Sequence, residues 1–393
     1  MHILEIPSFF TPYGGEFCLE QAKALKAQGN EVRILSNVQL SIKKSIKDFL
    51  FSPYARFTEN IEGIVVYRSY QHGVPKLIHF NVNRWVSIVR SMFKQYVDRY
   101  GKPDILHAHC CKWAGYAAML ISNEYGIPYV ITEHLSSMLY EKEFGKAPSS
   151  AWQIPLLKQA FSNASIVITV SDELVDDISC YFGKDYNNYT ISNIIDTSFF
   201  TYKKRESLVD RPFRFCCIAN NEYWKGYDIL LSAFNKLVKQ QSIYPQKDVE
   251  LHIAGRNTLS KDFLRMIKES GSEAKIIVHG ELNKNEVREL LYKCDCLVLP
   301  SRSEVQPLCI LEAMSSGIPY ISTEIIPRNL RLCDSCKIVP VNDSDALYLS
   351  MNEMISSYSS VDNKQLSDAV SKIASSEVVG KQLYTLFLHY IKT

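Results

Sequence analysis

Short apolar runs alternate with amphipathic helical patterns along most of this chain, and this alternation constrains the fold more than any other feature of the sequence. The first repeat of the pattern is a strand-like run at Ile3–Ile6, a loop at Thr11–Gly15 and a helical pattern at Glu16–Gln28. Further strand-like runs follow at Val32–Leu35, Ile64–Tyr67, Asp104–His109, Tyr129–Thr132 and Ile166–Val170. Strands that alternate with helices in this way predict an α/β domain with a parallel, doubly wound sheet.

The alternation restarts in the second half of the chain. A polar segment of weak periodicity, Asp196–Pro212, separates the halves, contains Lys203, Lys204 and Arg205, and is typical of a linker. The second set of strand-like runs is Phe213–Ala219, Leu251–Gly255, Lys275–Val278, Cys296–Leu299 and Tyr320–Ser322. A chain of 393 residues has room for two cores of ordinary size. We therefore expect two doubly wound domains, at residues 1–195 and 196–375.

The composition narrows the class of protein. Lys and Arg number 44 and Asp and Glu 42, a net charge of +2 that gives no reason to expect a nucleic-acid partner. No apolar stretch reaches the roughly 18 residues of a membrane span, and the N-terminal MHILEIPSFF has none of the sections of a signal peptide. The 11 cysteines are then expected as reduced thiols, mostly small core residues. These features predict a cytoplasmic location.

Some cysteine and histidine groupings invite a metal interpretation. A structural zinc site needs four converging ligands, usually from two paired motifs. The chain has one C-x-x-C, at Cys333 and Cys336, and no second one. A further cluster crowds one strand end and consists of His107, His109, Cys110 and Cys111. Without a second paired motif, we predict that the protein has no metal site and no cofactor.

Other familiar phosphate and metal motifs are absent or better explained as structure. The first turn lacks G-x-G-x-x-G and the chain has no Walker A pattern, so nicotinamide oxidation and P-loop hydrolysis are disfavoured. Gly14 and Gly15 precede a helix, where they allow a phosphate close to the backbone or simply form a tight turn. Asp343 and Asp345 precede a helical pattern, which favours an N-cap over a metal-binding D-x-D.

Two carboxylates eight residues apart mark the most distinctive segment of the second half. Glu304 falls in a loop after the apolar run that Pro300 closes, and Glu312 falls inside an apolar helical pattern that starts near Pro307 and stops at Gly317. A buried carboxylate is costly unless a polar group meets it, and a ligand hydroxyl is one such group. The helix N-terminus, with free amides near Leu308 and Cys309, suits a phosphate. The alternative is that both are solvated surface charges.

A series of motifs in this order resembles the family 4 glycosyltransferases. The segment Ser303–Pro319 resembles the family's E-x7-E motif and the EAM-x-x-G-x-P that follows it. The other matching motifs are the Gly-Gly loop Thr11–Glu16, the strand ending in HAH at Asp104–His109, Thr132-Glu133-His134, Val170-Ser171-Asp172, Ile191–Asp196 and Lys225-Gly226. The resemblance covers nearly the whole chain, including a last helix with Val379, Leu383, Leu386, Phe387 and Tyr390 at helical spacing.

The resemblance implies the GT-B fold, in which two Rossmann-like domains face each other across a deep cleft. It implies an acceptor-binding domain at 1–195, completed by a crossing helix at 376–393, and a donor-binding domain at 196–375. It further implies a retaining, metal-independent hexosyltransferase that moves a sugar from a UDP- or GDP-sugar to a glycan or lipid-linked glycan, in cell-surface polysaccharide biosynthesis.

The family pattern also assigns roles to residues of this chain. Glu312 should bind the ribose, Glu304 the hydroxyls of the transferred sugar, and His134 should lie near the donor sugar and the acceptor. Lys225 and backbone amides should meet the charge on the leaving diphosphate, because without a metal the protein must supply it. His134, Glu304 and Lys225 are thus the expected catalytic residues. The expected donor-binding residues are Gly14, Gly15, Asn220, Lys225, Gly255, Gly280, Glu304, Leu308, Cys309 and Glu312.

The chain departs from the family pattern at two places. Where the family has G-R-L before Lys225-Gly226, this chain has Ala219-Asn220-Asn221, so a common phosphate-binding arginine is absent. Asn220 can donate a hydrogen bond but carries no charge, and Arg256 or Arg302 is a candidate replacement. The Gly-Gly loop expected after Tyr320-Ile-Ser-Thr is also absent, which leaves the identity of the sugar open.

Two segments of the first half suit an anionic membrane or, alternatively, a loop and a core-facing helix. The first is basic and aromatic, and the second is an amphipathic helical pattern. The first consists of Lys43, Lys44, Lys47, Phe49, Leu50 and Phe51, and the second carries Trp85, Ile88, Val89, Met92, Phe93 and Tyr96 beside Arg84, Arg90 and Lys94. Peripheral contact with the inner face of the cell membrane therefore stays open, and the sequence does not indicate an oligomeric state.

Two other functions remain compatible with the same motifs. A nucleotide-sugar 2-epimerase on this scaffold would need an acid and a base flanking the sugar ring. A non-catalytic nucleotide-sugar binder would explain the missing arginine and the altered loop. Release of free nucleotide distinguishes a transferase from an epimerase, because an epimerase leaves the glycosidic phosphate bond intact.

Overall fold

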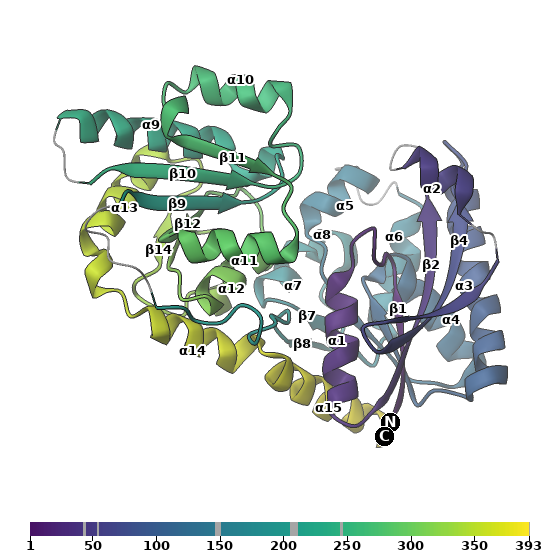
Figure 1. Ribbon diagram of the computed structural model, residues 1–393. Coiled ribbons are helices and arrows are strands. Elements are labelled where there is room, and N and C mark those ends of the chain that lie inside the picture. The colour runs from purple at the N-terminus through teal and green to yellow at the C-terminus, as the bar shows by residue number, and fades with distance from the viewer. Residues whose placement is uncertain (42–44, 53–54, 146–150, 205–210, 244–246, 393) are drawn as a thin grey trace. The chain divides into compact units, whose positions relative to one another are not determined.

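The computed structural model describes residues 1–41, 45–52, 55–145, 151–204, 211–243 and 247–392 (Figure 1). The chain divides into two compact units, one formed by Met1–Ile194 and Ser376–Thr393 and the other by Ile195–Ser375. The division expected from the sequence, 1–195 with 376–393 against 196–375, differs from it by one residue. Each unit is an α/β domain with a mainly parallel sheet, as predicted.

The first unit is built on an eight-stranded sheet with the order β3-β4-β2-β1-β5-β6-β7-β8. All neighbouring strands run parallel except β3, which pairs antiparallel with β4. The strands are β1 (His2–Pro7), β2 (Glu31–Leu40), β3 (Phe57–Ile61), β4 (Ile64–His72), β5 (Ile105–His109), β6 (Tyr129–Glu133), β7 (Ile166–Thr169) and β8 (Asn188–Thr190). β5 and β6 are buried along their whole length, and their carboxyl ends carry the buried polar residues His107, His109, Thr132 and Glu133.

Helices cover this sheet and complete its core. The helices of the first unit are α1 (Glu16–Ala27), α2 (Ile46–Phe51), α3 (Ile78–Tyr100), α4 (Tyr116–Tyr125), α5 (Ser137–Phe144), α6 (Gln153–Ser162), α7 (Glu173–Asp177), α8 (Ser179–Phe182) and α15 (Ser376–Lys392), with a π-helical turn at Cys111–Gly115. α15 lies beside α1, and its buried Val379, Leu383 and Phe387 join the core that α1 covers. The chain's last helix therefore belongs to its first domain.

The second unit has a six-stranded, fully parallel sheet with the order β11-β10-β9-β12-β13-β14. Its strands are β9 (Phe213–Ile218), β10 (Val249–Ala254), β11 (Ile276–Gly280), β12 (Cys296–Leu299), β13 (Tyr320–Thr323) and β14 (Lys337–Val339). Its helices are α9 (Tyr227–Ile243), α10 (Lys261–Glu269), α11 (Lys284–Lys293), α12 (Leu308–Ser315), α13 (Ser344–Ser357) and α14 (Asn363–Ala374). Because the strands are parallel, all their carboxyl ends meet at one edge, where ligands of such sheets bind.

The segment expected as a linker is instead part of the second unit. Phe200 is 1% exposed and belongs to the core that α12 and α14 cover, and Ser315 Oγ donates a hydrogen bond to its carbonyl at 2.5 Å. The start of the segment predicted as a linker, Asp196–Pro212, is thus part of the core, whereas residues 201–204 are exposed and have no helix or strand. Arg205 lies outside the described residues. The polar composition of the segment gave no indication that Phe200 is buried.

The helix that carries Trp85 and Tyr96 is α3, and its apolar face packs into the core of the first unit. Trp85, Val89, Met92, Phe93 and Tyr96 are all buried. The core-facing alternative for this helix is thus confirmed.

The basic and aromatic stretch is α2, in which Leu50 and Phe51 are 64% and 78% exposed, whereas Lys43 and Lys44 lie outside the described residues. Among the described residues, no helix is both long and apolar enough to cross a bilayer.

Candidate functional site

Glu304 and Lys225, which the sequence assigns to different parts of a ligand, form an ion pair with each other. Lys225 Nζ lies 2.6 Å from Glu304 Oε1, and Ser301 Oγ donates a second hydrogen bond to the same oxygen at 2.7 Å. The side chains are 20% and 8% exposed. Burial alone would lower the pKa of Lys225, but the Glu304 charge and hydrogen bond outweigh it and raise that pKa. Lys225 is therefore protonated at neutral pH.

A close backbone contact between two strand-end loops places this pair. Gly226 has φ +70°, and a Cβ at this position would lie 2.0 Å from the carbonyl oxygen of Pro300. The Arg302 amide donates a hydrogen bond to the Trp224 carbonyl at 2.7 Å. The loop after β9, which carries Lys225, thus rests directly on the loop after β12, which carries Glu304. The glycine of Lys225-Gly226 is required because no side chain fits between the two loops.

Glu312 has a different electrostatic state from Glu304. It lies in the middle of α12, and burial raises the pKa of its carboxyl to about 7. Among the described residues, no hydrogen-bond donor contacts its carboxylate, although the charge of Lys284 lowers the pKa slightly. A half-ionised carboxyl group without a donor is suited to accept hydrogen bonds from ligand hydroxyls.

The N-terminus of α12 lies after the same loop. Pro307 is its N-cap residue and provides no side-chain hydrogen bond, so the amides of Leu308 and Cys309 lack a side-chain cap. Leu308 is 38% exposed. Burial raises the pKa of the Cys309 thiol well above its usual value, so the residue is present as a neutral thiol. Their amides remain candidates for a phosphate contact, as the sequence predicts.

Asn220, Gly255 and Gly280 meet at the carboxyl ends of β9, β10 and β11. The Gly255 amide donates to the Gly280 carbonyl at 2.7 Å, and a Cβ on Gly255 would lie 1.9 Å from the Ala219 carbonyl oxygen. Asn220 Oδ1 accepts a hydrogen bond from the Arg256 amide at 3.0 Å and lies 3.5 Å from Arg256 Nε. Asn220, which stands where the family pattern has an arginine, therefore binds Arg256, which follows the neighbouring strand β10.

The two candidate replacement arginines differ in their partners. Arg302 binds Asp228 through two hydrogen bonds of 2.9 and 2.6 Å and also donates to Asn342 Oδ1 at 2.6 Å. Arg256 is exposed, and no carboxylate pairs with it among the described residues. Arg256 is thus the cation that remains available at this edge of the sheet.

The Gly-Gly loop and His134 come together in the first unit through Phe17, which the sequence analysis did not single out. Gly14 and Gly15 have φ of +97° and +82°, and a Cβ on Gly15 would lie 2.3 Å from the Phe9 carbonyl oxygen. The turn starts α1, and Phe17 in its first turn stacks on His134 with ring centroids 3.7 Å apart. Burial, with the nearby His109 and His107, lowers the pKa of His134 well below its usual value, so the ring is neutral.

Glu133 fixes the loop that presents His134. Its buried carboxylate accepts hydrogen bonds from the amides of Cys111, His134 and Leu135 and from the Tyr140 hydroxyl, each at 2.9 Å. Burial nevertheless raises the pKa of Glu133, in spite of these four donors. The turn after β5 and the turn after β6 are therefore tied to a single side chain.

A buried polar cluster lies beside His134. Glu5 Oε2 is 2.8 Å from His107 Nδ1 and 2.6 Å from His109 Nε2, and all three side chains are fully buried. Burial would raise the pKa of Glu5, but the two histidines lower it to about 2. Of the described residues, these three alone form a group of His, Cys, Asp or Glu ligand atoms close enough for a metal. Cys110 and Cys111 are outside it, and the absence of a metal stays a prediction.

The acidic pair at the start of α13 has the structural role that the sequence favours. Asp343 Oδ1 accepts hydrogen bonds from the amides of Asp345 and Ala346 at 3.0 and 2.8 Å. The N-cap prediction is confirmed. Cys333 and Cys336 are free thiols, as are the other cysteines of the chain.

Comparisons with known proteins agree with this arrangement. The family model described as Glycosyltransferase Family 4 matches residues 14–199, and the model described as Glycosyl transferases group 1 matches residues 198–372. The two matches follow one another and correspond to the two units. Together the two matches span residues 14–372 and, with the fold, support a glycosyltransferase of group 1 or family 4 with two Rossmann-like domains of the GT-B type.

Individual relatives are distant but cover much of the chain. A putative teichuronic acid biosynthesis glycosyltransferase, TuaC of Bacillus subtilis, is 24% identical over 81% of this chain and 79% of its own length. D-inositol 3-phosphate glycosyltransferase of Paenarthrobacter aurescens is 25% identical over 64% of this chain and 62% of its own.

Solved structures confirm the fold. Sucrose-phosphate synthase from Thermosynechococcus elongatus superimposes with a TM-score of 0.77, at 15% identity and 100% coverage of both chains. HepE from Anabaena, solved with UDP-glucose, gives a TM-score of 0.69 at 16% identity, with 99% of this chain and 100% of that chain covered.

We predict that the ionisation of Glu312 opposes folding. Because its pKa in the folded chain is about 7, against a usual 4.5, the folded state binds this proton more tightly than the unfolded state. Stability is therefore lost as the pH rises from about 4.5 through about 7. We expect Glu312→Gln to gain roughly 1–2 kcal/mol relative to wild type between pH 5 and pH 8, measured by urea unfolding.

Glu281→Gln, which changes an exposed carboxylate of the same unit, is the matched control and should show no such gain. A Glu312→Gln difference that is equal at both pH values would contradict the assignment.

Proposed function

We propose that the protein is a retaining, metal-independent glycosyltransferase that transfers a hexose from a UDP- or GDP-sugar to a glycan or lipid-linked glycan in polysaccharide biosynthesis. The observation that carries the proposal is the strand-end site of the second unit. There the Lys225–Glu304 ion pair, Glu312 without a hydrogen-bond donor among the described residues, and a helix N-terminus without a side-chain cap follow β9 and β12. The structure of HepE with UDP-glucose supports a nucleotide-sugar donor, and TuaC supports a role in polysaccharide synthesis.

The mechanism assigns each group a task that its environment suits. The leaving diphosphate gains charge as the glycosidic bond breaks, and the Lys225 ammonium with the α12 amides stabilises that charge. Lys225 has three N–H donors, so it can keep Glu304 and still contact a phosphate oxygen. Glu304, held by Lys225 and Ser301, has a second carboxylate oxygen for the hydroxyls of the sugar. Glu312 accepts hydrogen bonds from the ribose hydroxyls.

Retention of configuration follows from attack on the same face of the sugar. In this proposal the departing phosphate accepts the proton of the acceptor hydroxyl, so no separate general base is needed. The neutral state of His134 fits a residue that accepts or donates a hydrogen bond to a sugar hydroxyl without adding charge.

A donor panel tests the proposal. Thermal shifts are measured with UDP, GDP and ADP and with the glucose conjugate of each nucleotide. We expect Glu312→Ala to weaken the response to the nucleotide itself by about tenfold, since it removes hydrogen bonds to a charged acceptor. Glu304→Ala should retain the nucleotide response, because Lys225 and the α12 amides stay in place, and lose the preference among sugars, because it removes the carboxylate that binds them. Wild-type responses in both variants would contradict both assignments.

Arg256, and not Arg302, replaces the missing phosphate-binding arginine in this proposal. Arg302 is committed to Asp228, whereas Arg256 is held by Asn220 and has no carboxylate partner among the described residues. We expect Arg256→Met to weaken nucleotide-sugar affinity by about 10- to 100-fold, the range of a hydrogen bond between charged groups. Titration calorimetry at low and high salt measures this loss, which should shrink at high salt.

Arg302→Met is the matched control, because it removes an arginine of the same unit that already has a partner. It should lower the unfolding temperature more than it lowers the affinity. An affinity loss in Arg302→Met that equals or exceeds the loss in Arg256→Met would reverse the assignment.

Peripheral membrane contact through α2 is part of the proposal, for an acceptor that is linked to a lipid. The exposed Leu50 and Phe51, with the exposed Lys47 on the same helix, suit an anionic surface. We expect co-sedimentation with vesicles of phosphatidylglycerol at low salt, and loss of it in Leu50→Ser/Phe51→Ser. Wild type that stays in the supernatant at low salt would refute the contact.

A further inference from the structure

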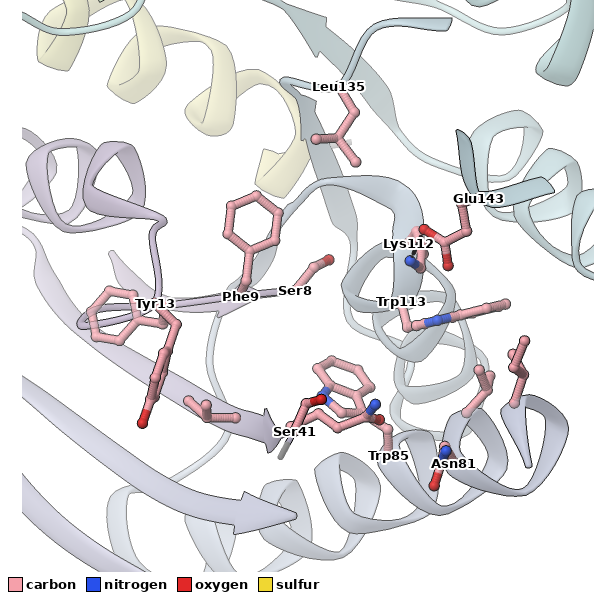
Figure 2. A pocket seen from close by; sticks show the side chains of 15 residues that line it. Ser8, Phe9, Tyr13, Ser41, Asn81, Trp85, Lys112, Trp113, Leu135 and Glu143 are labelled. Atoms are coloured by element: carbon pink, nitrogen blue, oxygen red, sulfur yellow. Dashed lines mark hydrogen bonds and ion pairs between the residues drawn. The ribbon is translucent and has the colours of Figure 1, made fainter. Parts of the chain in front are cut away.

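A cavity of about 380 Å³ opens in the first unit beside the Gly-Gly loop (Figure 2). It lies where β1 and β2 end, between the N-terminal part of α3, the π-helical turn and the loop after β6. Its volume falls in the lower part of the roughly 300–1,000 Å³ range of small-molecule sites. None of the residues assigned above to the donor lines it.

Aromatic side chains form much of the cavity wall. Phe9, Tyr13, Trp85 and Trp113 line it, and Trp113 is only 8% exposed. Trp113 is held by stacking on Trp152, with ring centroids 5.9 Å apart and an interplanar angle of 15°. Such rings offer flat faces with negative quadrupole charge, which attract C–H groups that carry partial positive charge.

Several polar groups of the lining already have partners in the protein. Trp85 Nε1 donates to the Asn37 carbonyl at 2.8 Å. Ser8 Oγ donates to the His109 carbonyl at 2.9 Å, and Asn81 exchanges two hydrogen bonds with the backbone of Val74. By contrast, the indole N–H of Trp113 has no hydrogen-bond partner among the described residues and can bind a ligand oxygen.

The one basic side chain of the described lining, Lys112, forms an ion pair with Glu143 (Figure 2). The two side chains are 23% and 39% exposed, so solvent and ligand can reach both. Paired in this way, Lys112 contributes no net positive charge to the cavity. A phosphate would have to compete with Glu143 for its cation, whereas a neutral hydroxyl can accept from Lys112 and donate to Glu143 at once.

We propose that this cavity binds one neutral sugar ring of the acceptor, and that the Lys112–Glu143 pair excludes phosphorylated acceptors. The inference rests on the proposed function and defines the acceptor class for the same reaction. A sugar ring has a C–H face, which packs on the aromatic wall, and an edge of hydroxyls, which meets Trp113 Nε1 and the ion pair. A long hydrocarbon chain fits less well, because it would bury the two charges without replacing their hydration.

Tryptophan fluorescence tests the proposal directly. The probes are the methyl glycosides of glucose, galactose, mannose and N-acetylglucosamine, with glucose 6-phosphate and farnesyl phosphate as competing ligand classes. We expect at least one methyl glycoside to shift the emission, with glucose 6-phosphate and farnesyl phosphate at least tenfold weaker. Trp113→Phe should reduce glycoside affinity about tenfold, and Trp224→Phe, which changes a tryptophan of the other unit, should leave it unchanged.

Glu143→Gln should create a gain in phosphate binding, because it removes the carboxylate that pairs with Lys112. This variant should bind glucose 6-phosphate about tenfold more tightly than wild type does, with the methyl glycoside affinity changed less than threefold. The proposal is overturned if no methyl glycoside binds, if glucose 6-phosphate or farnesyl phosphate binds wild type as tightly as the best glycoside, or if Glu143→Gln leaves phosphate binding unchanged.

The donor response of the same samples separates this inference from the proposed function. A wild-type protein that binds a nucleotide sugar but no glycoside refutes the acceptor subsite alone. A wild-type protein that binds a glycoside but no nucleotide sugar refutes the transferase and leaves a sugar-binding cavity.

Discussion

The ion pair between Lys225 and Glu304 is the interaction on which the proposed donor site depends. A buried pair has to overcome the loss of hydration of both charges, and it does so only when its geometry is fixed. Here the geometry comes from the backbone, since Gly226 lies against the Pro300 carbonyl and brings the loops after β9 and β12 into contact. In the proposed function, this pair provides a cation at the sheet edge for the diphosphate of the donor.

Carboxylates with little contact with solvent occur in both units, and their surroundings differ. Glu304 has a cation, Glu312 has no donor, Glu133 has four donors, and Glu5 has two histidines. Only Glu312 lacks an internal partner and has a pKa of about 7. Glu133 and Glu5 act within the protein, where they fix the turns around His134. The same residue type therefore supports the fold in one place and, in the proposed function, binds ligand in another.

Much of the fold could be predicted because parallel strands that are covered on both faces are rich in apolar residues. β12, for example, is buried at every position, and the predicted range Cys296–Leu299 is the observed one. The strands that the sequence analysis missed are β3, β8 and β14, which are short and lie at sheet edges with partly exposed residues, so they lack this pattern.

For the candidate site, the sequence predicted individual residues but not the contacts between them. Lys225 and Glu304 are 79 positions apart, and no local pattern reveals that they pair. For the same reason the link from Asn220 to Arg256, the stacking of Phe17 on His134 and the role of Glu5 emerge only from the tertiary structure.

Phosphorus-31 NMR of a nucleotide sugar mixed with the protein tests the central claim most directly, because it follows the bond that the proposed reaction breaks. The account predicts that the diphosphate resonances of the matching donor give way to those of the free nucleoside diphosphate. Proton spectra of the same sample should show a sugar product with the anomeric configuration of the donor. A new nucleotide sugar whose glycosidic phosphate bond is intact would identify an epimerase, and a bound donor that never changes would identify a binding protein; either result would contradict the account.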